Sequence, residues 1–252
     1  YSGNPNKGFV VRMIPKNWTY KPFMNVKKAS VKKLADALKS GSGVARLAAQ
    51  QELLTRSGGD AAKAAWKIAS DKKLPLQSRV AGIYTYAQAA GVGGLDNLVK
   101  LSQQEAVREF ALRALADRKP FLSNVPLEPF MQGLADASVR VQTAATIGLG
   151  RLGRAEAAAA LLQAKVPASF AAPALGTEGP HATPNSAIIP AHLAMRALVS
   201  LNAVDACVKA IDSPNATLAL WTLRYMHDPK AVNGLMATYK NTNGATLKTQ
   251  IL

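Results

Sequence analysis

Cysteine is almost absent from this sequence. The 252 residues include one, Cys207, so no internal disulfide can form and no cysteine pair is available for a zinc site or a c-type haem. Aromatic residues make up only 6% of the chain, which favours closely packed helices over a β-sandwich. No apolar run approaches the roughly 18 residues that indicate a transmembrane helix. We therefore expect a helical chain without a membrane span.

Motifs for catalysis and cofactor binding are also missing. The three histidines form no His-x-x-x-His pair, and no second or third metal ligand stands at coordinating spacing. Nothing resembles a nucleophile elbow, a P-loop or a dinucleotide fingerprint. We expect no catalytic, cofactor-binding or metal-binding residue in this segment. The sequence opens without an initiator Met and without a signal peptide, so we expect a mature product or a piece of a longer polypeptide.

Acidic residues are few: 15, against 31 Lys and Arg, for a net charge of +16. Residues 1–73 alone hold 15 basic and four acidic side chains, so most of the excess is N-terminal. Such a segment indicates an acidic partner, such as nucleic acid, a sulfated glycan or an acidic domain. The alternative is that lysines only keep an Ala-rich array soluble. The candidate partner-binding residues here are Lys27, Lys28, Lys32 and Lys33.

What the sequence does contain is a repeated helical pattern. Residues 138–153 form an amphipathic unit whose apolar side chains recur three and four residues apart, with small residues in the middle. Caps and Gly or Pro breaks place similar units along the chain. The predicted pairs are 30–39 with 44–56, 60–69 with 76–90, 95–102 with 106–118, 126–135 with 139–152, 155–163 with 190–201 and 204–211 with 216–227. A seventh pair opens at 229–240 and is cut short by the end of the sequence.

An arginine marks the start of the second helix in four successive pairs. Arg46, Arg79, Arg108 and Arg140 are separated by 33, 29 and 32 residues. A small residue follows each after three positions and an apolar or aromatic one after seven. We therefore expect these four arginines to have a structural role in the repeat.

The motifs Val107–Leu115 and Val139–Gly150 resemble HEAT repeats of the short bacterial kind, with a period below the usual ~40–47 residues. The resemblance extends from residue 30 to the end. It implies an all-α fold: a right-handed, armadillo-like α-solenoid of about six to seven helical hairpins. In that family the arginine often ties neighbouring units together through an acidic residue, which implies a structural role for Arg140.

Two segments do not fit the repeat. Residues 1–29 are expected to form a terminal strand (8–15) and a linker, with Trp18, Tyr20 and Phe23 packed on the first repeat. A single strand needs a sheet, so residues 8–15 either pair with a domain outside this sequence or lie over the first helices. The second segment is an insertion at 166–190 with five prolines. We expect it either to dock a partner or to pack along the array as a structural support. Its candidate partner-binding residues are Phe170 and His181.

The strand ending in ArgMetIlePro, with the later ProHisAlaThrProAsn and ArgTyrMetHisAspPro motifs, resembles one multidomain architecture of planctomycetes and verrucomicrobia. There, HEAT repeats lie between a dehydrogenase-like β-propeller and a c-type cytochrome. The resemblance implies a non-catalytic scaffold that docks these domains, periplasmic or extracytoplasmic, within a haem-dependent dehydrogenase whose haem c is bound elsewhere. The alternative is a basic solenoid that binds nucleic acid or another polyanion.

Overall fold

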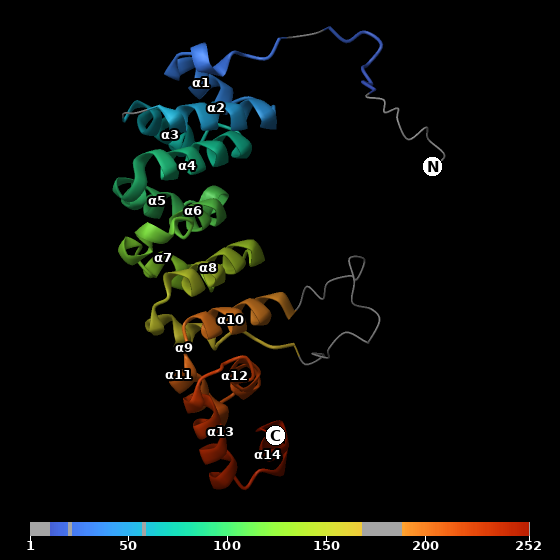
Figure 1. The fold of residues 1–252 in the computed structure, drawn as a ribbon, viewed down its shortest axis with the longest axis vertical. Coiled ribbons are helices and arrows are strands. Elements are labelled where there is room, and N and C mark those ends of the chain that lie inside the picture. The colour runs from blue at the N-terminus through green and yellow to red at the C-terminus, as the bar shows by residue number, and fades with distance from the viewer. Residues whose placement is uncertain (1–10, 20–21, 57–58, 168–187, 252) are drawn as a thin grey trace, which may run out of the picture.

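The described part of the chain is an elongated α-solenoid. The computed structural model describes residues 11–19, 22–56, 59–167 and 188–251, and within these ranges it contains fourteen α-helices and no strand. Figure 1 shows the helices stacked along one long axis. The predicted all-α solenoid is confirmed.

The described helices form seven consecutive pairs. The first helices are α1 (Val31–Leu38), α3 (Asp60–Ser70), α5 (Leu95–Ser102), α7 (Glu128–Gly133), α9 (Ala158–Leu161), α11 (Val204–Lys209) and α13 (Pro229–Asn241). The second helices are α2 (Gly43–Thr55), α4 (Leu76–Ala90), α6 (Arg108–Leu115), α8 (Val139–Leu152), α10 (Ile189–Ser200), α12 (Ala216–Leu223) and α14 (Ala245–Ile251). The short 3-10 turns are η1 (Val26–Lys28), η2 (Gly91–Gly94), η3 (Glu105–Val107), η4 (Lys119–Asn124), η5 (Ala155–Ala157) and η7 (Ala210–Asp212). Helix α14 was not predicted and supplies the seventh pair with a second helix.

Local chemistry sets the helix ends. The Ser30 hydroxyl accepts a hydrogen bond from the Lys33 N–H at 3.3 Å, which caps α1 as the sequence predicts. The Asp228 carboxylate caps α13 in the same way, with Pro229 at the first helical position. Helix α8 ends where Gly153 adopts a left-handed conformation at φ +68°. Because these signals lie within a few residues of each boundary, the sequence locates the helices well.

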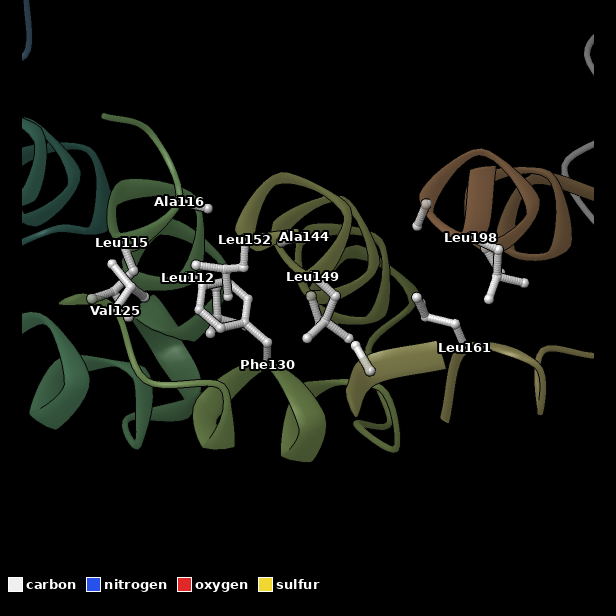
Figure 2. Packing of buried hydrophobic residues seen from close by; sticks show 14 of the residues in the cluster. Leu112, Leu115, Ala116, Val125, Phe130, Ala144, Leu149, Leu152, Leu161 and Leu198 are labelled. Atoms are coloured by element: carbon white, nitrogen blue, oxygen red, sulfur yellow. The ribbon is translucent and has the colours of Figure 1, made fainter. Parts of the chain in front are cut away.

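The second helices stack directly on one another, and the core runs along the stack. Each of α2, α4, α6, α8 and α10 contacts the next second helix, as Figure 1 shows. Figure 2 shows the interior of the middle pairs, where Leu112, Phe130, Leu149 and Leu198 are fully buried. These side chains come from α6, α7, α8 and α10, so each pair closes the core of its neighbours. A smaller cluster lies between α1, α2 and α3.

The N-terminal segment differs from the prediction. Residues 11–15 form no strand, because the described residues offer none to pair with. Val11 and Met13 are 83% and 96% exposed, and Figure 1 shows the segment leading away from α1, so this part does not lie over the first helices. Trp18 and Phe23 are 40% and 55% exposed rather than packed on the first repeat. Residues 8–10 and Tyr20 lie outside the described residues.

Two further observations bear on the sequence predictions. In the described part of the chain, no helix is both long and apolar enough to cross a membrane. Of the predicted insertion at 166–190, residues 168–187 lie outside the described ranges, and Phe170 and His181 are among them.

Candidate functional site

Three of the four predicted arginines close their own helical pair. Each donates to a carbonyl oxygen at or just beyond the end of the first helix, where carbonyls lack helical partners and a positive charge is favoured. The bonds run from Arg46 Nη1 to Ser40 O (2.7 Å), from Arg79 Nε to Ala69 O (3.0 Å) and from Arg108 Nε to Ser102 O (3.0 Å).

Two of these arginines also reach the following pair. Arg79 Nη2 donates to Gln104 Oε1 at 2.7 Å, and Arg108 Nη1 forms an ion pair with the Asp136 carboxylate. The Asp136 carboxylate also accepts the Ser138 N–H, and this bond, with the Arg108 contact, lowers the pKa of Asp136. Gln104 and Asp136 lie in the loops that join the helices of the next two pairs. The arginines therefore fix successive pairs to one another.

Arg140 makes a different contact. Its guanidinium reaches back to the preceding pair and binds Glu109 through two bonds, Nε to Oε2 at 2.7 Å and Nη2 to Oε1 at 3.0 Å. Hydrogen bonding to this carboxylate raises the pKa of Arg140. Glu109 also pairs with Arg113 of its own helix at 2.8 Å, and its side chain is only 9% exposed, against 71% for Arg140.

The register of the fourth pair therefore differs from the predicted one. Ile147, the apolar residue seven positions after Arg140, is 45% exposed, whereas Ala145 and Leu149 are fully buried. These two side chains stand three and seven residues after Gln142. The Gln142 amide donates to the Asp136 carbonyl at 2.6 Å, six residues back, as Arg46 does to Ser40. Gln142, not Arg140, thus occupies the equivalent position.

A second set of arginine contacts was not predicted. These arginines lie at or beyond the C-terminal ends of second helices, at the end opposite the first set. Arg56 reaches back to η1, and Arg118 and Arg151 reach back to the preceding second helix or the residue that follows it. The contacts are Arg56 Nη2 to Val26 O (3.1 Å), Arg118 Nη2 to Gln88 Oε1 and Arg151 Nε to Ala116 O (2.6 Å). The signal in the sequence is an arginine 10 or 11 residues after Arg46, Arg108 and Arg140. Both ends of the second-helix stack are therefore tied.

A groove crosses the N-terminal ends of the second helices α2, α4, α6 and α8. It consists of two adjoining pockets of about 460 and 850 Å³ that share Leu76 and Phe110. The first pocket is lined by Gly43, Arg46, Leu47, Gln50, Leu76, Gln77, Val80, Ala81 and Phe110. The second is lined by Leu76, Glu105, Ala106, Glu109, Phe110, Asp136, Ala137, Ser138, Arg140 and Val141. We call this surface the second-helix groove.

The four predicted partner-binding lysines lie together near the N-terminal end of the array. Lys27 and Lys28 belong to η1, and Lys32 and Lys33 to α1. All four are exposed. Within the described ranges, none forms an ion pair with an acidic side chain, so their charge faces solvent.

The single cysteine is buried in the core of the sixth pair. Cys207 is fully buried, and burial raises the pKa of its thiol to about 12. Because the thiolate is the reactive form, we expect no reaction with a disulfide reagent at pH 8 until denaturant unfolds the chain. Absorbance of the released thiol measures this. The control is Ser200→Cys, an exposed position, which should add one fast-reacting thiol. Fast labelling of the unmodified folded chain would contradict the burial.

The comparisons with known proteins identify the fold. No family model and no curated protein matches this chain. The crystal structure of Escherichia coli YibA, a HEAT-like helical repeat protein, matches with a TM-score of 0.52 and 18% sequence identity. The match covers 92% of this chain and 87% of YibA. At this identity the similarity concerns the fold alone, and it shows that the chain is a HEAT-like α-solenoid.

Proposed function

We propose that this chain is a non-catalytic scaffold that spaces and docks protein domains. The supporting observation is that neighbouring pairs are tied at both ends of the second helices, by Arg79 and Arg108 at one end and Arg151 at the other. Ties of this kind, added to a shared core, limit bending between repeats. An array that resists bending holds whatever is attached to it at a defined separation.

The domains that the array positions are, in this proposal, a dehydrogenase-like β-propeller and a c-type cytochrome of a larger periplasmic or extracytoplasmic redox protein. Support comes from the sequence motifs that resemble such proteins. Further support comes from Val11 and Met13, which are apolar but exposed, as residues that belong to a neighbouring sheet would be. With seven pairs and about 8–10 Å between packed helices, the array spans roughly 60–70 Å.

The experiment uses the complete polypeptide encoded around these residues. We expect the 252-residue chain alone to show neither turnover nor haem absorbance, and the complete polypeptide to show both. Replacing the array by a Gly/Ser linker of equal span should slow substrate-dependent haem reduction, because a flexible chain lowers the effective concentration of one domain at the other. A colourless complete polypeptide, or an unchanged rate with the linker, would rule out the proposal.

The exposed lysines favour a second candidate function, binding of a polyanion such as nucleic acid. Lys27, Lys28, Lys32 and Lys33 form no ion pair within the described residues and lie close together in sequence. If they contact phosphates, affinity for duplex DNA falls steeply between 50 and 200 mM salt. The double variant Lys32→Glu/Lys33→Glu should weaken binding and flatten this dependence. Lys230→Glu/Lys240→Glu is the charge-matched control, and absence of binding at low salt excludes this function.

A further inference from the structure

We propose that the second-helix groove binds an extended, proline-rich segment of a partner protein that carries a leucine-like side chain and, three residues later, Lys or Arg. The proposal rests on the scaffold function and names the surface and the partner chemistry through which one docked protein is held. Three properties of the groove lead to it: an exposed apolar half, an acidic half and the spacing between them.

The apolar half lies over α2 and α4. Leu47 and Leu76 line this pocket and are 55% and 47% exposed, and Val44, one turn before Leu47, is 69% exposed. Val80 and Phe110 are half-buried and also line this pocket. Single exposed apolar residues are ordinary, but several around one hollow indicate a binding surface. An apolar side chain of a partner fits this pocket and removes these residues from water.

The acidic half lies over α6 and α8. Three carboxylates and one guanidinium line it, in a chain whose net charge is +16. Glu109 is neutralised by Arg113 and Arg140, and Asp136 by Arg108. Glu105 is exposed and has no ion pair among the described residues. A basic side chain can therefore bind Glu105 without breaking an existing pair.

The spacing of the two halves selects the backbone conformation of the ligand. The pockets adjoin at Leu76 and Phe110. Leu76 of the apolar half and Glu105 of the acidic half lie at the N-terminal ends of the neighbouring second helices α4 and α6, which contact each other, so one helix spacing separates them. Packed helices lie about 8–10 Å apart. A polyproline II segment has three residues per turn and rises about 3.1 Å per residue, so positions i and i+3 share a face about 9 Å apart. In a β-strand the same-face positions fall at about 7 and 13 Å, which fits this spacing less well.

The test measures binding of a fluorescein-labelled ten-residue proline-rich peptide, with Leu and Arg three positions apart, to the 252-residue chain by fluorescence anisotropy. We expect saturable binding that Leu76→Ser and Glu105→Lys each weaken at least tenfold. A peptide with Arg moved to the second position after Leu should bind at least tenfold more weakly. Glu105→Lys should in turn prefer a peptide in which Glu replaces Arg.

Matched controls are Val92→Ser, which removes a 50%-exposed apolar side chain outside the groove, and Glu156→Lys, which reverses an exposed charge elsewhere. Both should bind like the unmodified chain, and circular dichroism checks that every variant is folded. Absence of binding at millimolar peptide, or equal binding by all variants, would overturn the proposal. A dimer that Leu76→Ser dissociates would assign the groove to a second copy instead. If the linker replacement still slows haem reduction, the scaffold function stands although the groove proposal falls.

Discussion

Replacing Gly148 by alanine is expected to destabilise the array by about 2–3 kcal/mol, within the range found for overpacked cores. A Cβ atom at this position would overlap the Cε1 and Cδ1 atoms of the Phe130 ring. Phe130 is fully buried, and Figure 2 shows it extending from α7 among the side chains of the neighbouring helices. The ring therefore has little room to move. The free energy of unfolding, from chemical denaturation followed by circular dichroism, measures the loss.

Gly43→Ala is the matched control for this prediction. Gly43 is also helical, but a Cβ there would meet only Arg46 Nη2 at 3.7 Å. Alanine has a better helix propensity than glycine by about 1 kcal/mol, so this variant should be neutral or slightly stabilised. In the Gly148→Ala background, Phe130→Leu should cost less than it does in the unmodified chain, because the smaller side chain relieves the overlap. Equal stability of the two alanine variants would contradict the packing described at Gly148.

Local sequence signals explain why the helices were predictable. The side-chain cap at Ser30, the left-handed glycine at Gly153 and the proline before α4 each act within one turn of the helix end they define. The predicted N-terminal strand shows the opposite case. A strand forms only against a partner strand, and Val11 and Met13 find none in the described part of the chain.

The register of α8 was not predictable because its sequence fits two answers. Both Val139-Arg140 and Val141-Gln142 resemble the Val107-Arg108 pair that opens α6. A shift of two residues turns a helix by about 200°, so only one valine can face the core. Contacts with the neighbouring pairs decide between them. Val141 is 5% exposed and is therefore the equivalent of the buried Val107, whereas Val139 is 57% exposed.

The candidate site was less predictable than the fold, because its contacts join residues far apart in the chain. Glu109 occupies a position that the sequence gives no reason to single out, yet it binds Arg140, 31 residues later. Leu76 lies in a largely polar stretch of the sequence, and this was a usable signal for an exposed apolar side chain, whereas Leu47 stands among alanines and gave no such signal. Their proximity to Glu105 follows only from the stacking of α2, α4 and α6.

Replacement by leucine should lower the free energy of unfolding strongly at Arg79 and only slightly at Arg140. Arg79 is 4% exposed, and burial lowers the pKa of its guanidinium, an effect that Asp71 partly offsets. Arg79→Leu keeps an apolar side chain there but removes the donors to the Ala69 carbonyl and to Gln104. Charge-assisted hydrogen bonds lost from a buried site cost about 2–3 kcal/mol. Chemical denaturation followed by circular dichroism measures this loss.

Arg140→Leu is the matched control, because it makes the same change at an arginine that the sequence predicts to be equivalent to Arg79. In the structure Gln142 occupies that position instead. Arg140 is largely exposed, and its partner Glu109 keeps the ion pair with Arg113. Exposed ion pairs contribute little to stability because water and salt screen them. We therefore expect a denaturation midpoint close to that of the unmodified chain. If Arg140→Leu instead destabilised the chain as much as Arg79→Leu, then Arg140, and not Gln142, would be the structural equivalent of Arg79.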